Sequence, residues 1–112
     1  MKLLRKSDIA ALRKNAFRAI SLGANVRPVV KFFNPCGAAT WLFSELAEDG
    51  DTLFGLCDLG MGCPELGYAS LSELSGIRLR FGLKIERDMH WKAARSLAEY
   101  AEEARSVGRI LS

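Results

Sequence analysis

Three short runs rich in β-branched and aromatic residues, joined by links too short to hold a helix, constrain the fold of this chain most. The runs cover residues 29–33, 40–46 and 52–58, and such residues favour strands. Two parallel strands need a crossover of about a dozen residues or more, which neither link provides. The sequence therefore predicts an antiparallel meander of three strands.

Further short elements surround this meander. The link before the third run contains Asp49-Gly50, a dipeptide typical of hairpins. Residues 66–69 are predicted to form a short strand, and a capping box opens a helical turn at 70–76. The alternating segment 83–88 is predicted to be the last strand.

A helix is predicted near each end of the chain. The first covers residues 7–22, with Ser7 as its cap and an apolar stripe that should face the core. The second covers residues 96–107 and opens with a capping box of Ser96 and Glu99. The stripe of the first helix consists of Ile9, Leu12, Ala16 and Ile20, with Phe17 beside it.

Length and composition agree with one folded domain. The chain has 112 residues, of which 49% are hydrophobic and 26% charged, which is typical of a globular domain. We therefore expect a single α+β domain over residues 1–112, an antiparallel sheet of four or five strands with N- and C-terminal helices packed on it. The strand aromatics expected in its core are Phe32, Phe33, Trp41, Phe43 and Phe54.

The sequence shows no membrane segment and no metal site. No apolar run approaches the roughly 20 residues of a membrane span, and the charged start is unlike a signal peptide, so we expect a cytoplasmic protein. The three cysteines, Cys36, Cys57 and Cys63, lack a Cys-x-x-Cys pair, and His90 is the single histidine. We therefore assign no metal and no cofactor, and interpret the cysteines as small buried hydrophobes.

Charge is segregated along the chain. Residues 1–31 hold eight basic side chains and one acid, residues 32–76 hold seven acids and no lysine or arginine, and residues 77–112 hold eight basic side chains and five acids. In one interpretation these segments pack together and neutralise each other in weak surface pairs. In the other, exposed acids form a surface that binds a basic partner or mimics the phosphates of a nucleic acid. The predicted partner-binding residues are Glu48, Asp49 and Asp51 in one turn, with Asp58 and Glu65 as further exposed acids.

Two other functions stay open. A small enzyme or ligand-binding domain would use the loop 60–68 with Glu86, Asp88 and His90, because two carboxylates on one strand face near a histidine and Tyr68 can serve acid–base chemistry. No catalytic motif accompanies them, and no catalytic residue is assigned. A nucleic-acid binder would use basic residues of the N-terminal part, although a pI near 8.9 is modest for that role. These residues are Arg13, Lys14, Arg18, Arg27 and Lys31.

A family resemblance covers nearly the whole chain. The block TLFGLCDLGMGCPELGYASLSEL at 52–74, followed by IERD at 85–88, resembles a family of short bacterial proteins of unknown function that is common on plasmids and other mobile elements. The likeness extends to PVVK at 28–31, ATWL at 39–42 and YAEEA at 100–104. The family has no established activity, so the resemblance assigns no catalytic residues.

The resemblance does imply a biological setting. Small accessory proteins of mobile elements often block host defence, as anti-CRISPR and antirestriction proteins do. We therefore expect a non-enzymatic protein that binds and blocks a protein or nucleoprotein target. A homodimer formed through the terminal helices is also expected. A small domain with so many apolar residues can leave apolar surface exposed, and such surface can form a dimer interface.

Overall fold

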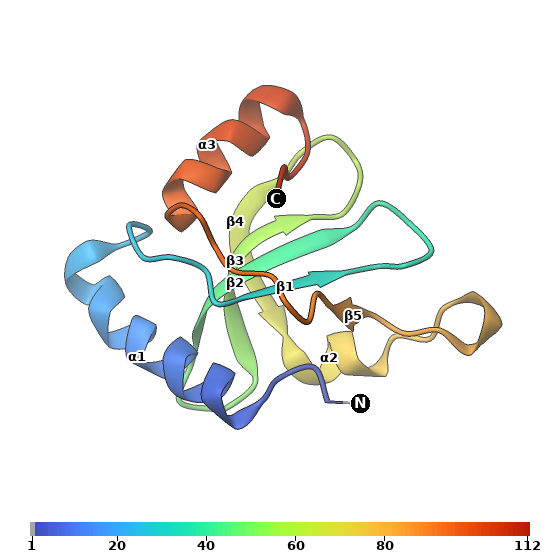
Figure 1. Ribbon diagram of the computed structural model, residues 1–112, viewed down its shortest axis with the longest axis horizontal. Coiled ribbons are helices and arrows are strands. Elements are labelled where there is room, and N and C mark those ends of the chain that lie inside the picture. Colours follow the sequence, from blue (N-terminus) through green and yellow to red (C-terminus); the bar gives the residue numbers. More distant parts are fainter. Residues whose placement is uncertain (1) are drawn as a thin grey trace.

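The short links hold the strands in an antiparallel meander, as the sequence predicts (Figure 1). The computed structural model describes residues 2–112. Its five-stranded sheet has the order β4-β3-β2-β1-β5, and every neighbouring pair is antiparallel. The strands are β1 (Val30–Phe33), β2 (Thr40–Leu46), β3 (Thr52–Asp58), β4 (Glu65–Ser70) and β5 (Glu86–Arg87).

The last strand is shorter than predicted. The sequence pattern predicts a strand over 83–88, but only β5 pairs, and it pairs with Phe32 and Phe33 of β1. The preceding residues form a 3-10 turn, Arg80–Gly82, in which Phe81 has φ 60°. The prediction is wrong here because β1 has four residues, so its free edge provides few partners for a longer strand.

The helices pack on this sheet, and two of the three begin at the N-cap residue that the sequence predicts. In α2 (Leu71–Gly76) and α3 (Leu97–Val107), the side chains of Ser70 and Ser96 accept the N–H groups of Glu73 and Glu99. In α1 (Lys6–Leu22) the cap is Arg5, two residues before the predicted Ser7. The backbone N–H of Arg5 donates to the Asp8 carboxylate at 2.7 Å.

Strand alternation divides the core into two clusters. Phe32, Trp41 and Phe43 pack in the first cluster together with residues of the N-terminal segment, α1 and α2. Leu42 and Leu56 pack in the second cluster against the apolar side of α3. These three aromatic residues are buried as predicted. Phe33 and Phe54 are only half-buried and line surface grooves instead.

The apolar stripe predicted for α1 faces the core only in part. Leu12 is fully buried, but Phe17 and Ile20 are 71% and 84% exposed. Asn15 provides the physical reason, because its side-chain amide donates to the backbone carbonyls of Ser44 and Arg27 at 3.0 and 3.2 Å. These bonds turn the Asn15 side of the helix toward the sheet and leave Phe17 and Ile20 outside.

Candidate functional site

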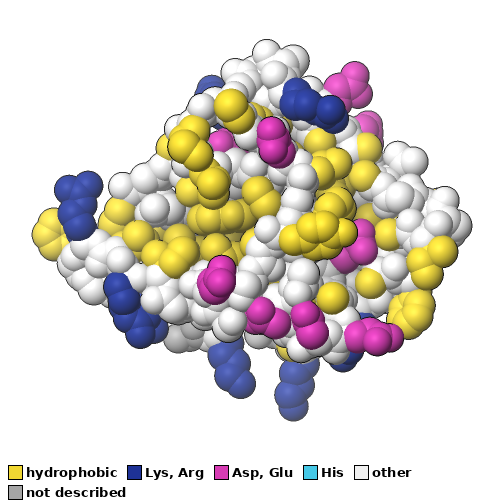
Figure 2. All heavy atoms as spheres, turned by 180° about the vertical axis from the view of Figure 1, so that it is seen from behind, with side chains coloured by type: hydrophobic (Ala, Val, Ile, Leu, Met, Phe, Trp, Pro, Cys, Tyr) yellow, Lys and Arg dark blue, Asp and Glu magenta, His cyan; other side chains and the backbone are white. Residues whose placement is uncertain are grey.

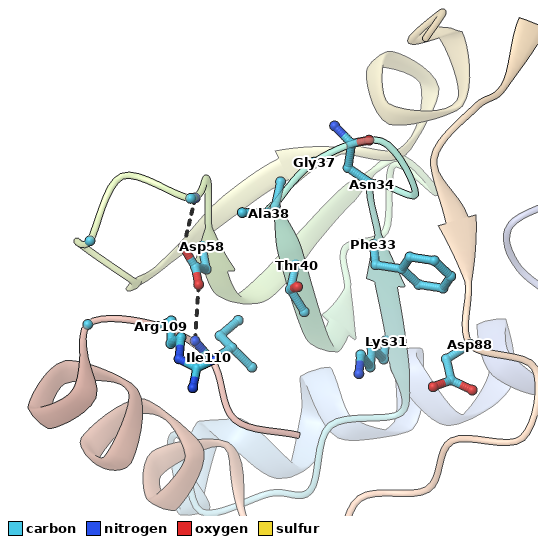
Figure 3. A pocket seen from close by; sticks show the side chains of 14 residues that line it. Lys31, Phe33, Asn34, Gly37, Ala38, Thr40, Asp58, Asp88, Arg109 and Ile110 are labelled. Carbon is cyan, nitrogen blue, oxygen red and sulfur yellow. Dashed lines mark hydrogen bonds between the residues drawn. The ribbon is translucent and has the colours of Figure 1, made fainter. Parts of the chain in front are cut away.

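A groove of about 650 Å³, which we call the polar groove, lies at one end of the sheet. Figure 3 shows Thr40 and Lys31 on the neighbouring strands β2 and β1, with Asp58 and Arg109 to one side and Asp88 to the other. The polar groove is lined by Lys31, Phe33, Asn34, Thr40, Asp58, Asp88, Arg109, Ile110 and the backbone of several glycines.

Strand register explains the floor of the polar groove. Phe33 lies opposite Thr40, and Thr40 lies opposite Asp58, so these three side chains share one face of the sheet. Lys31 belongs to the same face because it lies two residues before Phe33. It pairs with Leu42, which packs under α3. The groove therefore lies beside α3 on the sheet face that this helix covers.

Asp58 builds two walls of the polar groove. One carboxylate oxygen accepts the N–H of Gly60 at 2.8 Å, and the other accepts the N–H of Ile110 at 3.0 Å. The side chain thereby ties the β3–β4 loop and the C-terminal segment to the end of β3. The expectation that Asp58 is an exposed acid is wrong, since the residue is only 3% exposed. Such acids are buried when backbone amides satisfy both oxygens.

The predicted acid–base group is only partly brought together. Gly60 and Gly62 of the predicted loop line the polar groove together with Asp88. Tyr68 lies elsewhere, and neither Glu86 nor His90 lines this groove. Glu86 is half-buried and His90 is exposed. The structure therefore assembles a polar surface here, without the predicted carboxylate–histidine pair.

A second hollow, the apolar groove, lies between α1 and the strands β2, β3 and β4. It is defined by Ala16, Phe17, Ile20, Glu45, Phe54 and Tyr68, and its volume is about 360 Å³. Glu45, Phe54 and Tyr68 lie directly opposite one another on the three strands. The rings of Phe54 and Tyr68 are in contact, with centroids 5.0 Å apart, yet Tyr68 stays 75% exposed.

Two acidic side chains, Glu45 and Glu48, and one basic side chain, Arg13, line the apolar groove. Figure 2 shows the back of the molecule, where exposed apolar side chains cover much of the face and acidic side chains lie along its lower border. Glu45 is half-buried in the groove, and burial raises the pKa of its carboxyl group above the usual value. Glu48 also lines the groove. Carboxylates in such a setting favour a basic partner.

The predicted partner-binding acids do not form one patch. Glu48, Asp49 and Asp51 lie in the β2–β3 turn, whereas Glu65 starts β4 at the opposite end of β3. Asp49 accepts the N–H groups of Asp51 and Thr52, each at 2.8 Å. Asp51 accepts the Ser70 hydroxyl at 2.7 Å and the Ser72 N–H at 2.8 Å. Glu48 and Glu65 are exposed.

Segregated charge is not neutralised by ion pairs between the N-terminal and middle segments. Among residues 2–112 there are two salt bridges, Arg87–Asp8 and Arg95–Glu103. Neither joins a basic residue of the first 31 to an acid of residues 32–76. Arg13 instead donates to the backbone carbonyl of Glu48, at 3.1 Å. Lys14 and Arg18 are exposed on α1.

The thiols differ in their surroundings. Cys36 and Cys57 are half-buried and Cys63 is exposed, so the expectation of three buried cysteines is wrong for Cys63. Burial raises the pKa of the Cys57 thiol to about 11, which keeps it protonated and unreactive at neutral pH. Within the described part of the chain, no three histidine, cysteine or acidic side chains come together as a metal site.

Lys31 and Arg109 of the polar groove differ in how well the sequence could have indicated them. The predicted strands and their antiparallel order place Lys31, Thr40 and Asp58 on one face, so the register contains this signal. Arg109 follows the predicted end of the last helix and has no such signal. Its position depends on the hydrogen bond between Ile110 and Asp58.

Comparison with known proteins identifies a family whose function is unknown. In the described chain, residues 2–112, no helix has the length and hydropathy needed to span a bilayer. No curated protein and no solved structure matches the chain. One family, described as "Protein of unknown function (DUF2958)", matches residues 3–111. Because this match covers nearly the whole chain, the protein belongs to the DUF2958 family.

Proposed function

We propose that the protein is a non-enzymatic protein that binds a protein target through the apolar groove and blocks the activity of that target. The observation that carries this proposal is the exposure of Phe17, Ile20 and Tyr68 around one groove. Large aromatic and aliphatic side chains gathered in this way mark interaction sites, whereas scattered ones need no explanation. The family resemblance suggests defence proteins of bacteria as the first targets to examine.

Charge favours a target segment that carries both apolar and basic side chains. Glu45 is half-buried in the apolar groove and makes no salt bridge within residues 2–112. Glu48 extends the acidic border, and its neighbours Asp49 and Asp51 lie in the same turn. A lysine or arginine of the target would therefore meet acid at the groove while its apolar neighbours cover Ile20 and Tyr68.

The position of β4 at the edge of the sheet offers the target a second kind of contact, through the backbone. β4 is an edge strand that borders the apolar groove through Tyr68, and its only charged residue is Glu65 at its start. Natural edge strands are commonly protected by lysines, prolines or bulges, and the six residues of β4 have no lysine or proline. An extended target segment could pair with this edge while its side chains enter the groove.

The test compares groove variants in binding. Tagged protein is purified from a bacterial lysate with and without nuclease, and any stoichiometric partner is then bound to the purified chain. We expect Ile20→Glu and Tyr68→Ala each to weaken binding about tenfold or more, as central apolar anchors do. Phe81→Ala is the matched control, since Phe81 is 92% exposed and lies outside the groove.

Three outcomes would contradict the proposal. A partner that binds the groove variants as well as the wild type does not use this surface. A partner that is lost with nuclease would favour contact with nucleic acid through Arg13, Lys14 and Arg18 instead. A mass of twice 12.3 kDa in light scattering that reverts in Ile20→Glu would assign the groove to a homodimer.

A further inference from the structure

The polar groove contains two cations that the fold itself does not use. Lys31 comes from β1 and Arg109 from the segment after α3, and both line the groove (Figure 3). Neither belongs to the two salt bridges among residues 2–112, which use Arg87 and Arg95. Two unpaired cations that line one hollow attract anions, and a guanidinium with its fixed fork of donors suits a phosphate in particular.

The polar groove also contains two acids, Asp58 and Asp88, so the formal charges of its lining sum to zero, and the attraction for a phosphate depends on where the two cations lie. Asp58 is buried, and each of its oxygens already accepts a backbone N–H, from Gly60 and from Ile110. Its carboxylate is therefore occupied in holding the walls. Asp88 lies on the opposite side of Lys31 from Arg109 (Figure 3). Thr40 on the neighbouring strand β2 also lines the groove, and its hydroxyl can donate to an anion.

The walls let a ligand approach the backbone. Four glycines line the groove, and three of them, Gly60, Gly62 and Gly108, have positive φ. A Cβ added at Gly62 would meet no atom within 4 Å, so the space in front of it is open. The N–H groups of Gly37, Gly60 and Gly108 already donate to Asn34, Asp58 and Ala104. The N–H of Gly62 is therefore the one that these glycines offer to a phosphate oxygen.

The rest of the groove indicates an organic ligand rather than a free ion. About 650 Å³ lies within the usual range of small-molecule sites and far exceeds one phosphate. The half-buried ring of Phe33 provides an apolar surface. The Asp88 carboxylate on the far side can accept hydrogen bonds from hydroxyl groups.

We propose that the polar groove binds a small organic phosphate that carries hydroxyl groups, with its phosphate between Lys31 and Arg109. Thr40 and the N–H of Gly62 donate to the remaining phosphate oxygens. Phe33 packs against the carbon skeleton, and Asp88 accepts from its hydroxyls. This site is separate from the apolar groove and stands independently of the proposed function.

The test is an NMR titration of the full-length protein with adenosine 5′-monophosphate and glucose 6-phosphate. Adenosine and glucose are the matched probes without phosphate. We expect at least one of the two phosphates to shift the amide signals of Thr40, Gly62 and Arg109 in a saturable way, with a Kd below about 1 mM. The probes without phosphate should cause no such shift.

Substitutions then identify the cations. We expect Arg109→Met and Lys31→Met each to weaken binding about tenfold or more, because each removes a charge-assisted contact. Arg105→Met is the control, since Arg105 lies exposed on α3 and does not line the groove. Arg109 is exposed, so its variant should fold even if Lys31→Met perturbs β1.

Several results would overturn this proposal. No shift at about 10 mM of either phosphate would exclude a useful site. Equal shifts with adenosine and adenosine monophosphate would show that the phosphate is not the anchor. A single-stranded oligonucleotide that binds the same amides much more tightly than the monophosphate would assign the groove to nucleic acid. Ligand binding unaffected by Ile20→Glu keeps this test separate from that of the apolar groove.

Discussion

The buried carboxylate of Asp58 accepts a hydrogen bond from the backbone N–H of Ile110, 52 residues later in the chain, at 3.0 Å. Its second oxygen accepts the N–H of Gly60 at 2.8 Å. One side chain at the end of β3 therefore positions both the β3–β4 loop and the C-terminal segment. The shape of the polar groove depends on this arrangement.

Replacing this carboxylate should loosen both walls. Asp58→Asn keeps the size of the side chain but turns an NH₂ group toward a backbone N–H. We expect the free energy of unfolding to fall by about 1–3 kcal/mol, with faster hydrogen exchange at Ile110 and Gly60. Glu65→Gln is the control, because Glu65 is exposed and should change stability by less than about 0.5 kcal/mol. Unchanged exchange at Ile110 would contradict the structural role of Asp58.

The buried ion pair between Asp8 and Arg87 should be costly to break. It joins the first turn of α1 to β5, and Arg87 also donates to the carbonyl of Leu3 at 3.0 Å. We expect Arg87→Met to lower the free energy of unfolding by about 3–5 kcal/mol, because it leaves the Asp8 carboxylate buried and unpaired. The double variant with Asp8→Leu should recover part of this loss. Denaturant unfolding measures both, and a double variant less stable than Arg87→Met would contradict this explanation.

The same pair should make stability fall in acid. Burial acts most strongly and raises the pKa of Asp8, but the hydrogen bonds from Arg87 and the Arg5 N–H, with both positive charges, outweigh it and hold the pKa below 3.8. The folded state thus binds this proton more weakly than the unfolded state. The stabilisation is complete above pH 3.8 and is lost as the pH falls through the folded-state pKa. In Arg87→Met this loss should disappear from the pH dependence of unfolding.

The two sides of α1 should respond differently to truncation. Leu12 is fully buried, so Leu12→Ala should cost about 2–5 kcal/mol in unfolding free energy. Ile20 is 84% exposed, so Ile20→Ala should change stability by less than about 0.5 kcal/mol. Thermal or denaturant unfolding compares the two variants directly. A large loss for Ile20→Ala would mean that α1 packs through its predicted stripe after all.

Asp49 should titrate well below an ordinary aspartate. The hydrogen bond from the Thr52 hydroxyl, followed by the N–H groups of Thr52 and Asp51, lowers the pKa of Asp49 from 3.8 to about 2. Thr52→Val removes the hydroxyl alone, so the pKa should rise part of the way back toward 3.8. An NMR titration of the side-chain carboxyl measures it. An unchanged pKa in Thr52→Val would assign the effect to the backbone amides.

The sequence determined the frame of this protein in considerable detail. The runs at 40–46 and 52–58 become β2 and β3 with the same boundaries, and the box at Ser96 and Glu99 opens α3. These features follow from local chemistry: side-chain shape favours extended backbone, a serine accepts an N–H three residues later, and short links force antiparallel pairing. All of them act within a few residues.

Local patterns failed where a distant contact decided the outcome. By its periodicity Ile20 should be buried, yet α1 is turned by the amide of Asn15, which reaches the carbonyl of Ser44. Asp58 looked like a surface acid until the N–H of Ile110 placed it inside. In both cases a buried polar side chain is satisfied in part by a partner that lies far along the chain.

The same distinction between local pattern and distant contact applies to the two candidate sites. Strand register, which the sequence contains, places Lys31, Thr40 and Asp58 on one face of the sheet. Only the tertiary structure adds Arg109 to them and leaves Phe17, Ile20 and Tyr68 uncovered around a second groove. A sequence specifies which residues can be strand or helix through short-range sterics and hydrogen bonds. Which surface stays open depends on how helices and termini dock, and that is decided by the sum of long-range contacts.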